Sequence, residues 1–398
     1  VLNYGTGVDI GIWVVATGTW SRASDFDGAR DAVKGTIVLV APGTTDAEFF
    51  VVTTSGTISP GSTSITIERM SSTAATLLLD LANTSSTSAG DALIGVKRTE
   101  SDAVAQTVHV WIQKSSLRAT DFTGVDNTGS TDSTTGLLNA ITAAKASGKA
   151  LLFPNGSYKT TAPLPFGGQA GMRYWGEGQV VIYNTTTVAG SIVSIDSGGD
   201  TSRVDDIEMI NFILGGYSGV DYALDIRGLH RSRVHNIRAF NVFTTGIRMR
   251  YAVLNNFADL KCTQSVDTFT TTPTKGIFIG QTSSASFASS ANVFTNTIIE
   301  NPISGIGIDV DSGALNVFVG GTCESVPKGM VLRAGAISSS IIGMDFEDNS
   351  VIDAYVFGKS CAFRDVNASS DGSDGASSSV VSGAEGTSFS GGYVAATK

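Results

Sequence analysis

The chain has 398 residues and is acidic, with a formal net charge of −10 at pH 7 and a pI of about 4.8. This charge argues against binding to the phosphate backbone of nucleic acids, and no apolar run approaches the ~20 residues that a membrane-spanning helix needs. The opening segment, VLNYGTGVDIG, lacks the basic and long apolar regions of a secretory signal. The 46 glycines, with abundant Ser and Thr, favour a β-rich protein with many tight turns.

The cysteines and histidines predict neither a disulfide framework nor a metal centre. Cys262, Cys323 and Cys361 are scattered along the chain, and we expect them to be buried and reduced. The three histidines have no metal-ligand spacing. Complete phosphate-loop and dinucleotide-binding motifs are also absent, so we expect no metal and no cofactor.

Residues 1–70 predict a small β domain, because β-branched residues alternate there with Gly and Thr turns. The segment resembles the N-terminal parts of bacteriophage tail fibres and tailspikes, which carry a stretch similar to "GTxVxVxxGTTxA". The resemblance implies that this domain docks the protein to a phage tail, baseplate or adaptor protein. The matching positions are Gly35–Thr36, Val38, Val40, Gly43–Thr45, Ala47, Thr53–Thr54 and Ile58.

Residues 71–116 predict a short helical neck. Val104, Val108, Trp111 and Ile112 are spaced as one helical stripe, with Asp102 just ahead of it. The segment resembles the neck of tailspikes, where three chains meet, and this resemblance implies a homotrimer. The alternative is a helix that packs on its own chain.

Residues 117–368 predict the main body. The stretch from Asp121 to Leu164 resembles the opening module of pectate-lyase-like β-helices, through its DF, TD, PxG and Tyr158 positions. We expect a helix at about 135–147, capped by Gly148, that covers the open end of a solenoid. The fold class is therefore all-β: a right-handed, single-stranded parallel β-helix. The last residues, 369–398, are rich in Ser and Gly and predict loops, a linker or a final rung.

A repeat supports this fold. Three similar segments, NVFTNTIIEN, NVFVGGTCES and SIIGMDFEDN, begin at Asn292, Asn316 and Ser340, so that both offsets (316 − 292 and 340 − 316) are 24 residues. A second series, GIGI at Gly305 and GMVL at Gly329, has the same offset (329 − 305 = 24). One turn of a parallel β-helix needs about this many residues.

The repeat predicts a column of acidic side chains. Glu300, Glu324 and Asp348 occupy the same position in the three copies, and stacked rungs lie roughly 4.8 Å apart. Neighbouring and next-nearest members would then lie about 5 and 10 Å apart at the backbone, which brackets the carboxyl separations of retaining and inverting glycosidases, ~5–5.5 and ~6.5–9.5 Å. Asp345 and Glu347 are further catalytic candidates. The alternative is a structural column, in which the acids cap turns or pair with basic residues.

Aromatic and basic residues of the middle rungs are candidates for substrate binding, because sugar faces pack on aromatic rings and guanidinium groups bind acidic sugars. Pairing of the arginines with nearby aspartates, among them Asp205, Asp206, Asp221 and Asp225, is the alternative. The candidates are Trp175, Tyr217, Tyr222, Arg248 and Arg250.

These patterns together resemble a bacteriophage tailspike. The resemblance implies a virion protein that acts outside the host cell and binds a capsular or lipopolysaccharide glycan. We expect it to degrade that glycan by carboxylate-based glycoside hydrolysis rather than as a lyase. The alternative is a non-enzymatic structural or receptor-binding tail protein.

Overall fold

A computed structural model of the chain divides it into two units, Val1–Lys114 and Ser115–Lys398. The residues that it describes in the second unit, here called the body, are 116–185, 190–216, 220–241, 244–263, 274–281, 287–300, 304–369, 380–382, 386–391 and 393–394. In the first unit it describes short segments between residues 2 and 107. Tyr217 lies outside the described residues.

The first unit contains small antiparallel sheets. Strands β2 (Gly5–Gly7), β7 (Ile65–Arg69), β6 (Glu48–Val52) and β5 (Ile37–Val40) form one sheet in that order. Val52 and Ile67 pair across β6 and β7, and both are buried. A β structure within residues 1–70 therefore matches the sequence prediction, whereas its role as a virion anchor stays a prediction.

The neck segment differs from its prediction where it is described. Gln106–Thr107 (β9) pairs antiparallel with Gly95–Val96 (β8), although both residues fall inside the predicted helical stripe. The β-branched residues around them, Val104, Thr107 and Val108, favour extended backbone. The residues of the stripe itself lie outside the described part of the chain.

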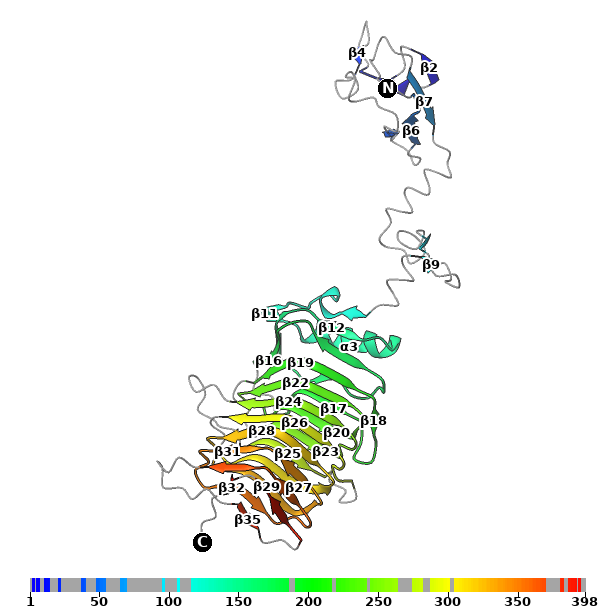
Figure 1. Ribbon diagram of the computed structural model, residues 1–398. Coiled ribbons are helices and arrows are strands. Elements are labelled where there is room, and N and C mark those ends of the chain that lie inside the picture. Colours follow the sequence, from blue (N-terminus) through cyan, green and yellow to red (C-terminus); the bar gives the residue numbers. More distant parts are fainter. Residues whose placement is uncertain are drawn as a thin grey trace. The chain divides into compact units, whose positions relative to one another are not determined.

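The body is a parallel β-helix, and Figure 1 shows its strands stacked rung upon rung. Two long parallel sheets, here sheet 1 and sheet 2, make up its walls. The described strands of sheet 1 are β10 (Leu117–Arg118), β11 (Thr128–Asp132), β12 (Leu151–Phe153), β13 (Gly156–Thr160), β15 (Arg173–Gly176), β16 (Val180–Asn184), β19 (Glu208–Gly215), β22 (Arg233–Phe240), β24 (Asn256–Thr263), β26 (Val293–Glu300), β28 (Val317–Glu324), β30 (Ser340–Ile342), β31 (Asp345–Glu347), β33 (Ala362–Arg364), β34 (Asn367–Ser369), β36 (Ser388–Ser390) and β37 (Tyr393–Val394).

Sheet 2 forms a second wall of the body. Its described strands are β14 (Leu164–Pro165), β17 (Ser191–Asp196), β20 (Tyr222–Arg227), β23 (Thr245–Arg250), β25 (Lys275–Gly280), β27 (Ile306–Ala314), β29 (Lys328–Ile337), β32 (Ile352–Val356) and β35 (Val380–Ser382). Successive strands of sheet 1 and sheet 2 alternate along much of the chain, as the coils of a β-helix require.

The predicted capping helix is confirmed as α3 (Thr134–Ser147), at the N-terminal end of the stack (Figure 1). Asp132 accepts the backbone N–H of Thr134 at 3.0 Å, which satisfies one donor of the first turn. Gly148 ends the helix in the left-handed region, with φ of 64°, where glycine avoids the strain of a side chain. Leu137, Ile141 and Ala144 of this helix are buried.

The strands β19, β22, β24 and β26 of sheet 1 each bend at one Asn or Asp with positive φ. This residue is Asn211, Asn236, Asp259 or Asn296 on four successive strands, with φ between 51° and 66°. Asn and Asp tolerate this left-handed conformation better than other non-glycine residues. The bend divides the outer face of sheet 1 into two strips, and residues after the bend make the strip that carries the candidate site.

In the core between the walls, residues of the same type stack on one another from rung to rung. Phe257, Phe294 and Phe318 lie on successive rungs with ring centroids 4.9 and 4.6 Å apart. All three rings are fully buried, as are the sulfurs of Cys262 and Cys323. Cys262, Cys323 and Cys361 are free and buried, as the sequence predicted.

A buried asparagine ladder runs alongside the phenylalanine stack. Asn255 donates to Asn292 Oδ1 at 2.9 Å, and Asn292 donates to Asn316 Oδ1 at 3.0 Å. Asn292 and Asn316 are the first residues of two repeat copies, so this ladder is the structural reason for the recurring Asn. At the other end, Asn255 accepts the backbone N–H of Ser232 and donates to Leu229 O.

Asn255→Ala tests this ladder. The substitution leaves several buried groups without a partner, each costing about 1–3 kcal/mol. We expect the free energy of unfolding to fall by about 3 kcal/mol or more in urea denaturation followed by circular dichroism. Asn256→Ala is the matched control, because the neighbouring Asn256 side chain is exposed, and it should change stability by no more than about 0.5 kcal/mol. Equal losses in the two variants would contradict a structural role for the ladder.

A buried carboxyl group lies on sheet 2. Asp353 is 1% exposed, and its Oδ1 accepts a hydrogen bond from Asn349 at 2.9 Å, while its Oδ2 has no partner. Burial raises the pKa of Asp353 to about 6, although the Asn349 hydrogen bond opposes this shift. Because this pKa lies above its ordinary value of 3.8, the folded protein holds the proton more tightly than the unfolded chain does.

Stability should therefore depend on pH through Asp353. The contribution of Asp353 to the free energy of unfolding is fully present below about pH 4 and is lost as pH rises through about 6, a change on the order of 3 kcal/mol. Urea titrations from pH 4 to 7.5 should show that Asp353→Asn lacks this loss. Asp365→Asn, at an exposed position, should keep the wild-type profile. A wild-type profile in Asp353→Asn would rule out this titration.

Candidate functional site

Glutamates on three successive rungs form a column on the outer face of sheet 1. Glu300 at the end of β26 pairs in register with Glu324 of β28, and Glu324 pairs with Glu347 of β31. Rung spacing puts neighbouring backbone positions about 4.8 Å apart and the outer two about 10 Å apart. We call Glu300, Glu324 and Glu347 the glutamate column.

The prediction that Asp348 belongs to this column is wrong. The third copy of the repeat is offset by 23 residues rather than 24, because Val317 pairs with Ser340 and Glu324 with Glu347. Asp348 lies instead at the corner that follows β31, with φ of 51°. Ser325 occupies the corresponding corner on the preceding rung. The Gly305–Gly329 alignment is wrong in the same way, since Ile306 pairs with Lys328 at an offset of 22 residues.

Asp345 lies on the same face as the glutamate column. It pairs in register with Thr322 and precedes Glu347 by two residues, so both side chains point outward from β31. Asn367 of the next rung donates a hydrogen bond to Asp345 Oδ1 at 2.9 Å. The structure thus brings together four of the five predicted acids and separates Asp348 from them.

An ion pair joins the column to the rung above it. Lys261 Nζ lies 2.7 Å from Glu300 Oε2, and each side chain is about one third exposed (34% and 32%). At this exposure, solvent screening limits the stabilisation to at most about 1 kcal/mol. The pair fixes the direction of Glu300 more than it stabilises the fold.

A shallow groove of about 340 Å³ lies across the rungs next to the column. Its polar lining comes from the bend residues Asn211, Asn236 and Asp259 and from the outward residues that follow them. Arg238 and Lys261, each two residues past a bend, are neighbours in register on β22 and β24. The other lining residues are Gly178, Gln179, Val180, Phe212, Ile213 and Ile237.

Sequence reasoning missed Arg238 and Lys261. If the rungs are aligned on the Asn or Asp at the bend, Arg238 and Lys261 fall at the same outward position, two residues after the bend. That alignment needs the positive φ at Asn236 and Asp259, and neither residue type by itself distinguishes such a bend from an ordinary turn.

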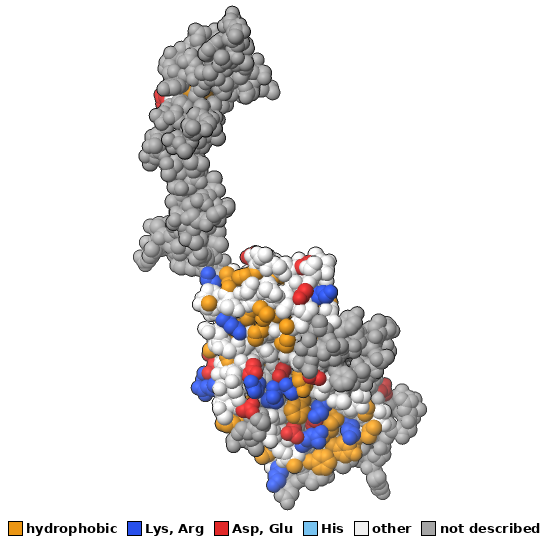
Figure 2. All heavy atoms as spheres, turned by 180° about the vertical axis from the view of Figure 1, so that it is seen from behind, with side chains coloured by type: hydrophobic (Ala, Val, Ile, Leu, Met, Phe, Trp, Pro, Cys, Tyr) orange, Lys and Arg blue, Asp and Glu red, His pale blue; other side chains and the backbone are white. Residues whose placement is uncertain are grey.

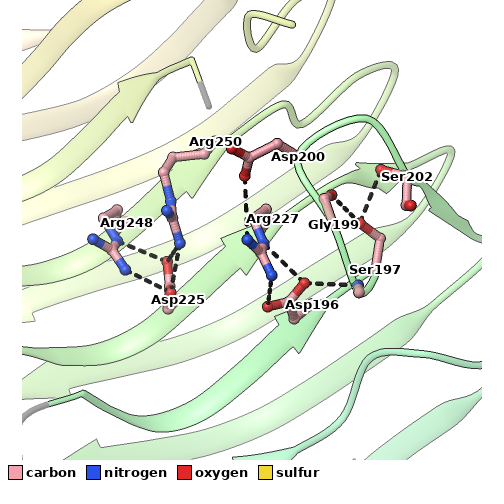
Figure 3. A network of polar contacts seen from close by, with 10 residues as sticks. Asp196, Ser197, Gly199, Asp200, Ser202, Asp225, Arg227, Arg248 and Arg250 are labelled. Carbon is pink, nitrogen blue, oxygen red and sulfur yellow. Dashed lines mark hydrogen bonds and ion pairs between the residues drawn. The ribbon is translucent and has the colours of Figure 1, made fainter. Parts of the chain in front are cut away.

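The predicted substrate-binding arginines lie on sheet 2 and are engaged in ion pairs (Figure 3). Arg248 binds Asp225 through two hydrogen bonds of 2.8 and 2.7 Å, and Arg250 binds the same carboxylate at 2.9 Å. Burial by itself would lower the pKa of Arg248, but the hydrogen bonds and charge of Asp225 outweigh it and raise this pKa. The Asp-pairing alternative therefore describes Arg248 and Arg250.

The same pattern recurs one rung earlier. Arg227 pairs with Asp196 and Asp200, and the hydrogen bonds that it donates to Asp196 raise the pKa of the Arg227 guanidinium (Figure 3). Figure 2 shows basic and acidic side chains interspersed across one face of the body. These pairs connect successive rungs of sheet 2.

The predicted aromatic residues do not form one site. The Arg248 guanidinium lies 3.6 Å from the ring centroid of Tyr222 and donates to its hydroxyl at 2.7 Å, so Tyr222 belongs to the sheet 2 ion-pair cluster. Trp175 lies on sheet 1 before the bend, where its Nε1 donates to Glu208 at 3.3 Å. Neither residue lines the groove.

Within the described ranges, no three His, Cys, Asp or Glu side chains gather in a way that could hold a metal ion. A search of the same residues finds no helix long and apolar enough to cross a membrane. The described residues of the glutamate column and the groove supply carboxylates, amides and the cationic side chains of Arg238 and Lys261.

Comparison with solved structures supports the fold. The chain is similar to the ORF18 protein of Geobacillus virus E2 (15% identity, TM-score 0.52), over 76% of this chain and 69% of that one. It is similar to PfbA, a surface adhesin of Streptococcus pneumoniae (11%, TM-score 0.55), over 71% and 80% of the two chains. It is also similar to the enzymatically active domain of tailspike protein 2 of bacteriophage CBA120 (10%, TM-score 0.53), over 92% of this chain and 52% of that domain.

These likenesses show a parallel β-helix fold of the kind that phage tailspikes and a bacterial adhesin share. No family model matches the sequence, and no curated protein does. At identities of 10–15%, these likenesses show the fold alone.

Asp225→Asn tests the structural role of the arginines. The loss of this carboxylate leaves two half-buried guanidinium groups without their shared partner, so we expect the free energy of unfolding to fall by roughly 2 kcal/mol. Arg233→Gln is the control, because Arg233 is exposed and forms no ion pair with a described residue; it should stay within about 0.5 kcal/mol of wild type. An unchanged stability in Asp225→Asn would contradict the rung-connecting role.

Proposed function

We propose that the chain is a phage tailspike that binds and cleaves a bacterial surface polysaccharide, either a capsule or an O-antigen. The observation that carries the proposal is the register of Glu300, Glu324 and Glu347 on successive rungs beside an open groove. Solved tailspike and adhesin structures with this fold support it.

The proposed reaction is glycoside hydrolysis by two carboxyl groups. One carboxylic acid protonates the glycosidic oxygen while a second carboxylate attacks the anomeric carbon or activates a water molecule. Glu324 belongs to both adjacent pairs of the column, so we assign it the acid role. With Glu300 or Glu347 as its partner one rung away, this arrangement suits a retaining reaction.

We further propose that residues 1–70 attach the chain to a phage tail, baseplate or adaptor protein, and that three copies assemble as a homotrimer. The protein would then act outside the cell, at the host surface. The antiparallel β structure within residues 1–70 supports the attachment role, since it is built separately from the β-helix.

One contact favours a second function, which is glycan binding without cleavage. The Lys261–Glu300 ion pair engages one member of the glutamate column, as a structural column would. A non-enzymatic receptor-binding tail protein would use the same groove to hold a glycan without cleaving it.

Glu324→Gln separates the two functions. The purified protein is incubated with capsule and O-antigen from candidate hosts, and new reducing ends and the absorbance of unsaturated uronates are measured. We expect wild type to produce reducing ends on a glycan that it binds, and Glu324→Gln to lose at least 100-fold in rate while binding persists, as removal of a general acid predicts. Glu177→Gln, at an exposed glutamate paired with Arg118, should retain full activity.

Two outcomes would overturn the reaction proposed for the glutamate column. One is the absence of both signals on a glycan that the protein binds, which would favour the receptor-binding function. The other is full activity in Glu324→Gln, which would make the glutamate column structural.

A further inference from the structure

Arg238 differs from most arginines of the body because no described carboxylate neutralises it. Its side chain is exposed, and the contact that it makes is a 3.4 Å hydrogen bond from Nη2 to Thr263 Oγ1. No described Asp or Glu oxygen lies within 4.0 Å of it, whereas Arg227, Arg248 and Arg250 are paired with aspartates. The guanidinium fork of Arg238 is therefore open to a planar anion.

Lys261 is the register neighbour of Arg238 on the next rung, so two cationic side chains lie side by side in the groove. Lys261 already holds one carboxylate, that of Glu300, at 2.7 Å. A ligand anion at Arg238 would lie about one rung, roughly 4.8 Å, from the Lys261 position and about two rungs from Glu300.

The amide groups of the bends supply hydrogen-bonding partners for hydroxyls. Asn236 donates to Asn211 Oδ1 at 2.9 Å, and Asn211 donates to the carbonyl of Gly176 at 3.2 Å. Asn236 Oδ1 receives no hydrogen bond from a described residue, so it can accept one from a sugar hydroxyl. The half-buried Ile213 offers an apolar surface between these groups.

We propose that this groove is a subsite for a carboxylated sugar, such as a uronate residue of an acidic polysaccharide. Arg238 binds the carboxylate with two parallel hydrogen bonds, and Asn236 and Gln179 bind ring hydroxyls. The proposal rests on glycan binding in the proposed function, and it does not require that the glutamate column be catalytic. The proposal specifies that the sugar bound on the rungs that precede the glutamate column carries a negative charge.

Binding of defined tetrasaccharides tests the subsite. The probes are uronate tetrasaccharides (galacturonate, mannuronate and a glucuronate-containing hyaluronan fragment), each compared with its carboxyl-reduced neutral counterpart by titration calorimetry. We expect wild type to bind at least one acidic tetrasaccharide tenfold or more tightly than its neutral counterpart, with an affinity that falls as salt is raised. Arg238→Gln should abolish this preference.

Arg233→Gln provides the matched control, because Arg233 lies on the same strand, is exposed, and precedes the bend. It should bind as wild type does, and equal thermal unfolding of both variants would show that folding is intact. A lack of preference for every acidic tetrasaccharide, or an unchanged preference in Arg238→Gln, would overturn the proposal. Tighter binding of glucose 6-phosphate than of glucuronate would also overturn the carboxylate assignment.

Glu324→Gln distinguishes this proposal from the catalytic one. If the glutamate column is structural, Glu324→Gln leaves both cleavage and acidic-sugar preference unchanged. If the subsite assignment is wrong and catalysis is right, cleavage is lost in Glu324→Gln while Arg238→Gln retains its wild-type binding.

Discussion

The parallel backbone ladder between rungs is the constraint on which the rest of the structure depends. Each outward side chain is held in line with the residue one rung above and one rung below, at a repeat of about 4.8 Å. Any side chain therefore meets the same few neighbours: its register partners and the residues two positions away on its own strand. Like residues then stack, as Phe257, Phe294 and Phe318 do inside and the glutamate column does outside. The strand register that stacks similar side chains in the core also places like charges next to one another on the surface.

Such a stack needs devices that keep rungs from slipping, and the body uses two kinds. Inside, the amides of Asn255, Asn292 and Asn316 bond from rung to rung, where a slip would leave them unpaired in an apolar core. Outside, arginines of sheet 2 bind aspartates on an earlier rung, as Arg248 does with Asp225. Asp309 shows the strongest form, since this fully buried carboxylate is bound by Lys275 from one side and Arg333 from the other. Register is therefore held from both faces of the wall.

The sequence predicted much of this architecture and less of the site, for identifiable reasons. The capping helix was predicted within one residue of its observed start, because the apolar stripe and Gly148 are local signals. The glutamate column was predicted from the repeat, but its third member was displaced by one residue, because Glu347 and Asp348 are adjacent acids and one rung is a residue shorter. The pairing of Arg248 with Asp225 and the meeting of Arg238 with Lys261 depend on strand register across rungs of unequal length, which a single sequence does not define. In the neck, helical spacing competed with β-branched composition, and at Gln106–Thr107 the extended conformation prevailed.

The strip of sheet 1 beyond the bend changes sign along the axis of the stack. Arg238 and Lys261 lie on consecutive rungs, and the next rungs carry Glu300, Glu324 and Glu347. An anionic group placed on this strip would be attracted at Arg238 and repelled at the glutamate column, which begins about two rungs away. The strip therefore sets the position at which a negative charge can sit along the axis of the stack.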